Sequence, residues 1–352
     1  MIDPKHIHEK DFEFIVNQPL PWKNLEGKVV LVTGASGMIA SRMVEVLLYL
    51  NKKVFTKKST IYAVVRDKGK ALQRFDQYVN DEHLNIIVGD VSQPLSFDKK
   101  VDVIIHAASQ ASPIYFGKDP VGTLLPNVVG TYHLLELARR DSVDSFLFIS
   151  SGEVYGEVTD EQVPIKETTF GYIDINNLRA CYSESKRMGE TMCVSWFHQF
   201  GVPVKIVRPF HIYGYGLKPH DGRVFGDFIF DIVNRRDIVM KSDGQVKRSF
   251  CYLADAVAGF FTVLLKGELC SVYNVGNDTT VITIIDLANR LVTLFPERDL
   301  KVIKKERILS KGYLQSSVIS TYPDITKIKQ LGWKPVFSIE EGFTRAIESI
   351  ES

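Results

Sequence analysis

Short apolar runs alternate with longer amphipathic segments over the first two thirds of the chain. The runs are rich in β-branched residues and indicate strands at residues 29–33, 60–65, 85–88, 101–105, 145–150 and 204–207. Their nearly continuous apolarity is typical of parallel strands, which are covered on both faces. Between them, apolar residues at helical spacing indicate helices at residues 39–50, 121–140 and 182–199. This alternation predicts an α/β fold built on a doubly wound parallel sheet.

A glycine-rich turn, TGASGMIA at residues 33–40, follows the first strand and opens the first helix. Such a turn leaves backbone N–H groups unpaired at a helix N-terminus, where the helix dipole favours a negative group such as a pyrophosphate. A tight turn without a ligand is the alternative, but the position in the first βαβ unit favours a dinucleotide and a Rossmann fold. The expected contacts to the cofactor here are Gly34, Ser36, Gly37, Met38 and Ile39.

Residues at the ends of the other strands are further candidates, because the carboxyl ends of parallel strands face the ligand in such folds. The second strand ends at Arg66 and Asp67, where an acidic residue suits the ribose hydroxyl of NAD and a basic one the 2′-phosphate of NADP. We expect NAD, with NADP left open by Arg66; two solvated turn residues are the alternative. Asp90 either accepts a hydrogen bond from the adenine amino group or caps a turn. The other expected cofactor contacts are Val91, Ala107, Ala108, Ser109 and Pro209.

After Pro209 the sequence becomes rich in glycine, tyrosine, histidine and aspartate, and mixed short elements follow. This change in composition suggests a second lobe. We expect residues 1–27 to be an N-terminal extension and residues 28–208 a dinucleotide-binding domain to which residues 250–270 return. Residues 209–249 and 271–352 are expected to form a smaller C-terminal substrate-binding lobe. Ligands in doubly wound folds bind in the crevice outside the strand ends.

Composition and charge narrow the function classes. The 352 residues carry 43 basic and 42 acidic side chains, so no strong field favours nucleic acid or an anionic membrane. No apolar run approaches the roughly 20 residues that a membrane span needs. The four cysteines show no CxxC spacing and no signal peptide precedes them, so we expect free thiols and a cytoplasmic protein. His6 and His8 have no third ligand nearby, and no metal site is expected.

Tyr182 and Lys186 lie four residues apart in a predicted helix, and therefore on one face and one turn from each other. A neighbouring cation lowers the pKa of a phenol, so the tyrosine can exchange a hydroxyl proton while hydride moves at the adjacent carbon. Lys186 would also reach the nicotinamide ribose. The pair alone is a common surface pattern. The preceding strand, however, ends in FISSGEVYG, which places the hydroxyl of Ser151 where it can hydrogen-bond the reacting oxygen.

These segments resemble the extended short-chain dehydrogenases/reductases that modify nucleotide sugars, the NAD-dependent epimerases and dehydratases. The resemblance runs from about residue 28 to the C-terminus and includes TGASGMIA, HAAS, SSGEVYG, RACYSESKRMGETM, VRPFHIYGYG, DGRVFGDFI, SDGQVKRSFCYLADAV and DITKIKQLGWKPVFSIEEGF. RACY at residues 179–182 and DGRV at residues 221–224 are most similar to UDP-glucuronate decarboxylases. The resemblance implies a catalytic set of Ser151, Glu153, Tyr182 and Lys186 and a substrate-binding set of Arg179, His211, Arg223 and Arg248.

The reaction that this resemblance implies begins with oxidation of the sugar C4 hydroxyl to a ketone. A carboxylate at C5 can then leave as carbon dioxide, water can be eliminated across C5 and C6, or the sugar can turn over and be reduced on its other face. Gly152 stands where the dehydratases carry an aspartate, which argues against 4,6-dehydration. His211 stands where most relatives carry asparagine, and it either binds diphosphate, transfers a proton or merely lines the pocket.

We therefore expect an enzyme that decarboxylates UDP-glucuronate, with a nucleotide-sugar 4-epimerase or 4,6-dehydratase as the alternative. A carbonyl reductase that consumes NADPH in each turnover is another alternative. It would share Tyr182, Lys186 and Arg66 but would not need SDGQVKRSF, the segment expected to bind a diphosphate. A cofactor-sensing scaffold is the non-enzymatic alternative. By analogy with relatives, we expect a homodimer in which the helix from Val121 and the helix of Tyr182 pair across a two-fold axis.

Overall fold

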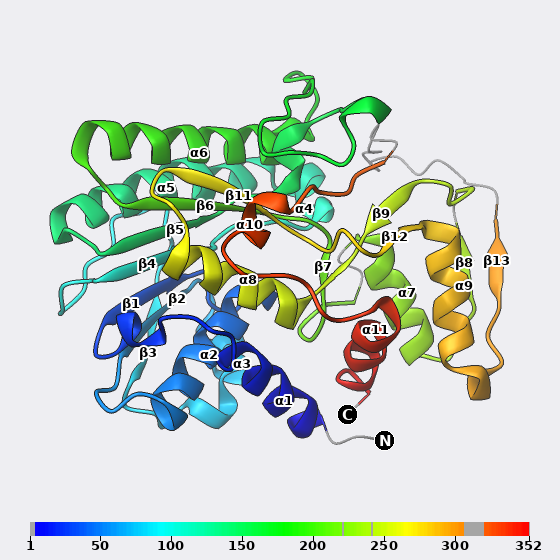
Figure 1. Ribbon diagram of the computed structural model, residues 1–352, viewed down its shortest axis with the longest axis horizontal. Helices are drawn as coiled ribbons and strands as arrows, with labels where there is room; N and C mark the ends of the chain where they lie inside the picture. Colours follow the sequence, from blue (N-terminus) through cyan, green and yellow to red (C-terminus); the bar gives the residue numbers. More distant parts are fainter. Residues whose placement is uncertain (1–3, 220–221, 241, 306–319, 352) are drawn as a thin grey trace.

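The computed structural model describes residues 4–219, 222–240, 242–305 and 320–351. Its centre is a seven-stranded sheet in the order β11-β6-β5-β4-β1-β2-β3, and every neighbouring pair is parallel. Figure 1 shows this sheet between two layers of helices. The predicted Rossmann-type fold is therefore confirmed. The strands of the sheet are β1 (Val29–Thr33), β2 (Thr60–Val65), β3 (Leu84–Val88), β4 (Val103–His106), β5 (Ser145–Ile149), β6 (Val204–Pro209) and β11 (Ser271–Val275).

The bounds of four strands, β3 to β6, differ from the sequence prediction by one or two residues, and a fifth strand, β11, differs in the part of the fold to which it belongs. The fourth begins at Val103 rather than at residue 101 and extends to His106. Strand β11 was assigned to the C-terminal lobe, but it pairs with β6 from Ser271 opposite Lys205 to Val275 opposite Pro209. That assignment of residues 271–275 is wrong because the free edge of β6 binds a strand that follows it by more than sixty residues in sequence.

The two faces of the sheet are covered by different helices, and the alternation of side chains along β1 shows how. Val30 and Val32 belong to one buried cluster together with residues of α2 (Met38–Lys53) and α8 (Leu253–Lys266). Leu31 belongs to another cluster, which contains residues of α5 (Pro120–Asp141) and α6 (Ala180–Phe200). Because successive residues of a strand point to opposite faces, a wholly apolar strand needs helices on both.

The N-terminal helix α1 (Pro4–Val16) packs against α8 and α2. Its Asp11 is buried, accepts a hydrogen bond from the hydroxyl of Tyr252 at 2.7 Å and one from Nη1 of Arg345 at 2.8 Å. Figure 1 shows α1 in dark blue beside α8 and near the C-terminus. The segment expected as an extension is therefore joined to the middle and the end of the chain by a buried carboxylate.

A second group of elements lies beside the large sheet. Helices α7, α9 and α11 pack against one another and, on the right of Figure 1, against short two-stranded sheets. No described helix is long and apolar enough to cross a membrane. The remaining helices and strands are α3 (Lys68–Arg74), α4 (Pro113–Lys118), β7 (Ile212–Tyr213), α7 (Val224–Val233), β8 (Ile238–Met240), β9 (Lys247–Ser249), β10 (Cys251–Tyr252), β12 (Val281–Thr283), α9 (Ile284–Leu294), β13 (Val302–Lys304), α10 (Thr326–Lys329) and α11 (Ile339–Glu348).

Candidate active site

The glycine-rich turn joins β1 to α2 at the carboxyl edge of the sheet. Gly34 has a φ of +64°, and a Cβ there would lie 2.7 Å from Cα of Ala108. Gly37 is the N-cap residue of α2, where the absence of a capping side chain leaves the backbone N–H groups of the first turn accessible to a ligand. Met38 and Ile39 open the helix and are half-buried, as is Ser36. No side chain of Gly34 or Gly37 covers the backbone N–H groups of this turn, so a pyrophosphate can approach them closely.

A buried hydrogen-bond network that sequence reasoning missed supports this turn. The hydroxyl oxygen of Thr33 accepts hydrogen bonds from the backbone N–H groups of Ala107 and Ala108, both at 3.2 Å. It also lies 2.9 Å from Nδ1 of His106, whose Nε2 lies 3.1 Å from the hydroxyl of Thr131. The end of β1 is thereby tied to the end of β4. The HAAS segment indicated small residues near the cofactor, but nothing local showed that His106 faces Thr33.

The predicted cofactor contacts at the other strand ends lie on the same edge. Arg66 is exposed after β2, whereas Asp67 caps α3 by accepting a hydrogen bond from the backbone N–H of Lys70 at 3.0 Å. Asp90 is exposed and accepts a hydrogen bond from the N–H of Ser92 at 2.8 Å. This contact fits the second of its two predicted roles, the capping of a turn. Val91 is buried and Pro209 half-buried at the end of β6. Their contacts to adenine, ribose and nicotinamide stay predictions.

Two observations indicate that a dinucleotide fits at the strand ends. A side chain at Gly34 would fill the space next to Ala108, so the turn is open only because this residue is glycine. The hydroxyl oxygen of Ser109, directly after the Ala107-Ala108 pair, is buried without a hydrogen-bond partner among the described residues. Buried polar atoms are almost always paired, so an orphan at this edge indicates a missing ligand group.

We expect the Gly34→Ala variant to lose about tenfold or more in affinity for NAD. The added methyl group meets backbone 2.7 Å away, and an alanine at positive φ costs roughly 1–2 kcal/mol. Isothermal titration calorimetry with NAD measures the effect. Gly201→Ala is the matched control, since Gly201 also has a positive φ, of +70°, but has nothing within 4 Å of its Cβ position. Equal affinity of the two variants for NAD would contradict the assignment of the turn.

Tyr182 and Ser151 meet at the end of β5. Tyr182 is buried on α6, and its ring stacks on that of Phe116 with centroids 4.9 Å apart. Ser151 is also buried and accepts a hydrogen bond from the N–H of Glu153 at 3.1 Å. Burial raises the pKa of Tyr182 to about 12, while a hydrogen bond with Ser151 opposes this rise. In this structure the phenol is therefore protonated at neutral pH.

Lys186 lies one turn further along α6, and its ammonium group donates a hydrogen bond to the carbonyl oxygen of Ile149 at 2.7 Å. Burial lowers its pKa to about 7, against the opposing charge of Glu190. The charges that act on Tyr182 come from Glu153 and Arg223. Burial dominates the pKa of both groups in this structure, and the ammonium group donates to β5, so the activation of Tyr182 by Lys186 stays a prediction.

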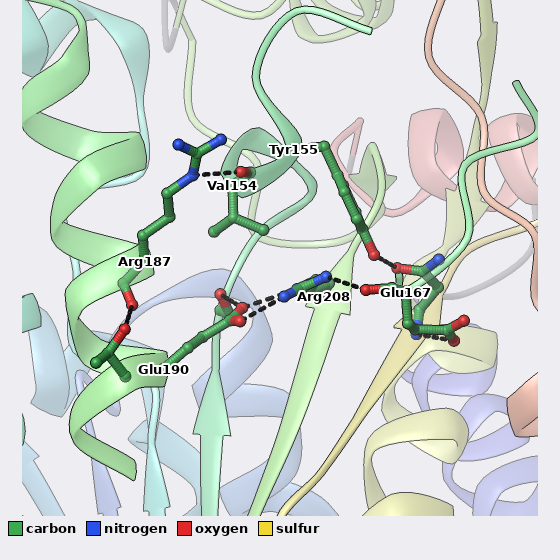
Figure 2. A network of polar contacts seen from close by, with 9 residues as sticks. Val154, Tyr155, Glu167, Arg187, Glu190 and Arg208 are labelled. Carbon is green, nitrogen blue, oxygen red and sulfur yellow. Dashed lines mark hydrogen bonds and ion pairs between the residues drawn. The ribbon is translucent and has the colours of Figure 1, made fainter. Parts of the chain in front are cut away.

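A second network, which sequence reasoning also missed, surrounds the next turn of α6 (Figure 2). The carboxylate of Glu190 accepts two hydrogen bonds from the guanidinium of Arg208 on β6, at 2.9 and 2.6 Å, and one from the hydroxyl of Ser150 at 2.5 Å. Arg208 also donates to the carbonyl oxygen of Glu167 at 3.1 Å. A signal was present in the sequence, since Glu190 follows Lys186 at helical spacing, but its partner on β6 was not visible.

The side chains predicted to bind substrate gather beside Tyr182. Nη2 of Arg179 donates to both carboxylate oxygens of Glu153, at 3.2 and 3.4 Å. Burial lowers the pKa of Arg248 to about 10, and the charge of Glu153 raises it. The charge of Arg223 lowers the pKa of Tyr182. Asp221 of the DGRV segment lies outside the described residues. Arg179 is in contact with Glu153, the charge of Arg223 acts on Tyr182, and the charge of Arg248 interacts with that of Glu153, so this region can bind a ligand with several negative charges.

His211 follows Phe210, whose ring lies 3.1 Å from the Cβ position of Gly152 next to Glu153. Its φ is +40°. Burial lowers the pKa of its imidazole to about 3, and the charges of Arg248 and Arg223 lower it further. The ring is therefore neutral at physiological pH, and its predicted role as a diphosphate ligand would use an N–H donor and not a positive charge.

Comparison with known proteins agrees with this geometry. The model of the NAD dependent epimerase/dehydratase family matches residues 30–276. The chain is 31% identical over 315 residues to UDP-glucuronic acid decarboxylase 6 of Arabidopsis thaliana, which covers 89% of this chain and 86% of the relative. It is 31% identical over 346 residues to UDP-glucuronic acid decarboxylase 1 of Danio rerio, with 97% and 78% covered.

The fold is shared with solved structures. A UDP-glucuronic acid 4-epimerase from Bacillus cereus, solved with UDP-glucuronic acid and NAD, superposes with a TM-score of 0.73 at 22% identity. The match covers 92% of this chain and 98% of the epimerase.

Proposed function

Because the chain belongs to the NAD dependent epimerase/dehydratase family, we propose that it oxidises C4 of a nucleotide sugar and that its substrate is UDP-glucuronate, which it decarboxylates. The chain is an enzyme of this NAD-dependent family. The observation that carries the proposal is that Ser151, Tyr182 and Lys186 are all buried at the end of β5, with the Glu153–Arg179 ion pair at 3.2 Å close by. Curated relatives that act on UDP-glucuronate support the choice of substrate.

In the proposed reaction, the hydroxyl of Ser151 orients the C4 oxygen and Tyr182 takes its proton. The glycine turn and the strand ends would hold NAD, which would supply the acceptor for the hydride that leaves C4 and the donor that returns it. The C5 carboxylate is then β to a ketone, so the bond between C5 and C6 breaks with release of carbon dioxide. The bonding electrons pass into the enolate, which is protonated at C5, and Glu153 is the side chain that we assign to this proton.

The remaining proposed roles are electrostatic. Arg179, Arg223 and Arg248 bind the diphosphate and the sugar carboxylate, since a guanidinium fork matches both groups. Lys186 holds the ribose next to the nicotinamide and supplies positive charge close to Tyr182. A phenol with a pKa of about 12 does not accept a proton readily at neutral pH. We therefore infer that ligand binding turns Lys186 from Ile149 toward Tyr182 and the ribose.

NAD is the proposed cofactor, and exposed Arg66 is the feature that would favour NADP. Titration of the purified protein with each dinucleotide distinguishes them. Preference for NADP would show that Arg66 binds the 2′-phosphate, and would overturn this part of the proposal. All four cysteines are free thiols in the structure. The cytoplasmic location of the protein stays a prediction.

The test is incubation of the protein with NAD and UDP-glucuronate, with product masses as the readout and Tyr182→Phe as the control. Loss of carbon dioxide, absent from the control, is expected. A product of unchanged mass and altered retention would identify a 4-epimerase, the second candidate, which starts with the same oxidation. Loss of water from a hexose substrate would identify a dehydratase despite Gly152. Net consumption of NADPH with simple carbonyl compounds would instead support the reductase, and no binding of any nucleotide sugar would support a scaffold.

We also propose that the protein is a homodimer joined through α5 and α6. These helices expose large apolar side chains, among them Leu124 (39% exposed), Tyr132 (45%) and Met188 (49%). We expect Met188→Glu to convert the dimer to a monomer, because the new carboxylate would be buried without a partner. Size-exclusion chromatography with light scattering measures the mass. Leu72→Glu is the matched control, since Leu72 is 41% exposed but lies on α3, and a monomeric wild-type protein would contradict the proposal.

A further inference from the structure

The ring of Phe116 on α4 is buried outside the apolar core. Its residue is 1% exposed, yet among the described residues it belongs to none of the three clusters of buried apolar side chains. Such clusters normally contain the large buried apolar side chains of a domain. Tyr182, which the ring contacts, is also absent from all three clusters. Phe116 is therefore packed against the candidate active site and not into the core.

The ring of Phe116 touches two side chains of that site. It stacks on the ring of Tyr182, with centroids 4.9 Å apart and planes inclined by 16°. The guanidinium of Arg179 lies over it, with Cζ 5.6 Å from the centroid of the ring. Arg179 in turn donates to both carboxylate oxygens of Glu153. Stacked rings and a cation over a ring face are both favourable arrangements, so one ring stabilises the placement of the phenol and of the guanidinium.

The segment that carries Phe116 is closed on itself. Asp119 follows α4 directly, and its Oδ1 accepts a hydrogen bond from the N–H of Gly122 at 3.0 Å, which caps α5. Its Oδ2 accepts a hydrogen bond at 2.9 Å from Nε2 of Gln110, a buried residue that precedes α4. The two ends of the segment are thus joined by one carboxylate, and a single residue separates α4 from α5. A ring on such a short, tied segment has little freedom to move.

We propose that Phe116 is a positioning residue, whose ring sets the orientation of the Tyr182 phenol relative to the Arg179 guanidinium. The inference rests on the proposed function, in which Tyr182 takes the proton of the C4 hydroxyl and Arg179 binds the substrate. A phenol that is turned away from the C4 oxygen transfers a proton poorly, and misplacement of a reacting group by about 1 Å can cost about a hundredfold in rate. An aliphatic side chain fills part of the same space but cannot stack.

Steady-state kinetics with NAD and UDP-glucuronate test the proposal. We expect Phe116→Leu to lower kcat about tenfold, because the phenol loses its fixed orientation. The KM for UDP-glucuronate should change less, since the other predicted contacts to the ligand are kept. Phe116→Tyr keeps the ring and should have a kcat close to that of the wild type. Calorimetric binding of NAD shows that each variant is folded.

Phe261→Leu is the matched control. Phe261 is buried on α8, within the apolar core, where its ring lies 5.2 Å from that of Trp22 between centroids. The variant loses a buried ring just as Phe116→Leu does, but it loses it away from Tyr182. It should therefore lose stability and keep wild-type kcat, whereas a purely structural role of Phe116 would give the two leucine variants the same kcat.

NMR of protein labelled in its tyrosine rings provides an arm that does not depend on the sugar, with Tyr182→Phe used to assign the signal. The ring current of Phe116 should shift the ring protons of Tyr182 upfield in the wild type. We expect this shift to disappear in Phe116→Leu and to remain in Phe261→Leu.

Three outcomes would overturn the proposal and leave the proposed function intact. They are an unchanged Tyr182 signal in Phe116→Leu, wild-type kcat in that variant, and equal losses of kcat in Phe116→Leu and Phe116→Tyr. If the wild type releases no carbon dioxide from UDP-glucuronate, the proposed function fails and this inference fails with it. That case is recognised because the wild type and Phe261→Leu are then equally inactive while both bind NAD.

Discussion

The Tyr182→Phe protein is expected to keep NAD and UDP-glucuronate bound while kcat falls by about 10³, within the 10²–10⁴ that a positioned acid–base group contributes. The substitution removes one oxygen atom and leaves the ring stacked on Phe116. Oxidation at C4 then lacks the group that takes the proton, whereas the binding contacts from the glycine turn and the arginines are unchanged. The fall should therefore appear in kcat and not in KM.

Single-turnover measurements of reduced cofactor at 340 nm check this expectation. Tyr62→Phe is the matched control: Tyr62 is buried on β2, and its hydroxyl donates to Asp98, away from the strand ends. That variant loses a buried phenolic hydroxyl and should keep wild-type kcat. A Tyr182→Phe protein with more than a tenth of wild-type kcat would show that another group takes the proton, and would remove Tyr182 from its proposed role.

Breaking the Glu190–Arg208 pair is expected to cause the largest loss of stability, about 3–5 kcal/mol for Glu190→Leu. The side chains are only 11% and 10% exposed, so the substitution leaves a guanidinium buried without its carboxylate. The hydroxyl of Ser150 loses its acceptor, and the guanidinium of Arg208 keeps the carbonyl oxygen of Glu167 but loses the carboxylate. The free energy of unfolding, measured by urea denaturation, should fall accordingly.

The double variant Glu190→Leu/Arg208→Met separates the pair from its surroundings. Apolar side chains of similar size often replace a buried ion pair without loss, because the desolvation cost of both charges disappears. We expect the double variant to be more stable than Glu190→Leu alone. If the effects of Glu190→Leu and Arg208→Met simply add, the two residues are not coupled and the network in Figure 2 does not act as a unit.

Much of the fold could be predicted from local pattern. The second strand has the predicted bounds, Thr60–Val65, because β-branched residues form a run there that only a buried strand accommodates. The boundary of β4 shifted because the ladder begins after Asp102, whose carboxylate accepts a hydrogen bond from the N–H of Val29 at 2.8 Å. That contact joins residues 73 positions apart, and no local pattern contains it.

The candidate site divides in the same way. Gly34, Tyr182 and Lys186 could be proposed from spacing and position, because a turn and a helical face are local properties of the chain. His106 and Glu190 were missed, although each lies within a segment that drew attention. Their partners, Thr33 and Arg208, are brought to them only when separate strands of the sheet align.

By itself, the sequence determined the order of strands and helices, the glycine turn, the helical face that carries Tyr182 and Lys186, and the family. These follow from the periodicity of apolar residues and from the backbone freedom of glycine. The tertiary structure alone decided that β11 completes the sheet, that α1 is joined to Arg345 through Asp11, that burial raises the pKa of Tyr182 and that Glu190 pairs with Arg208. Each of these depends on contacts between segments that are remote in sequence. Such contacts, and the burial that shifts a pKa, form only when the whole chain packs.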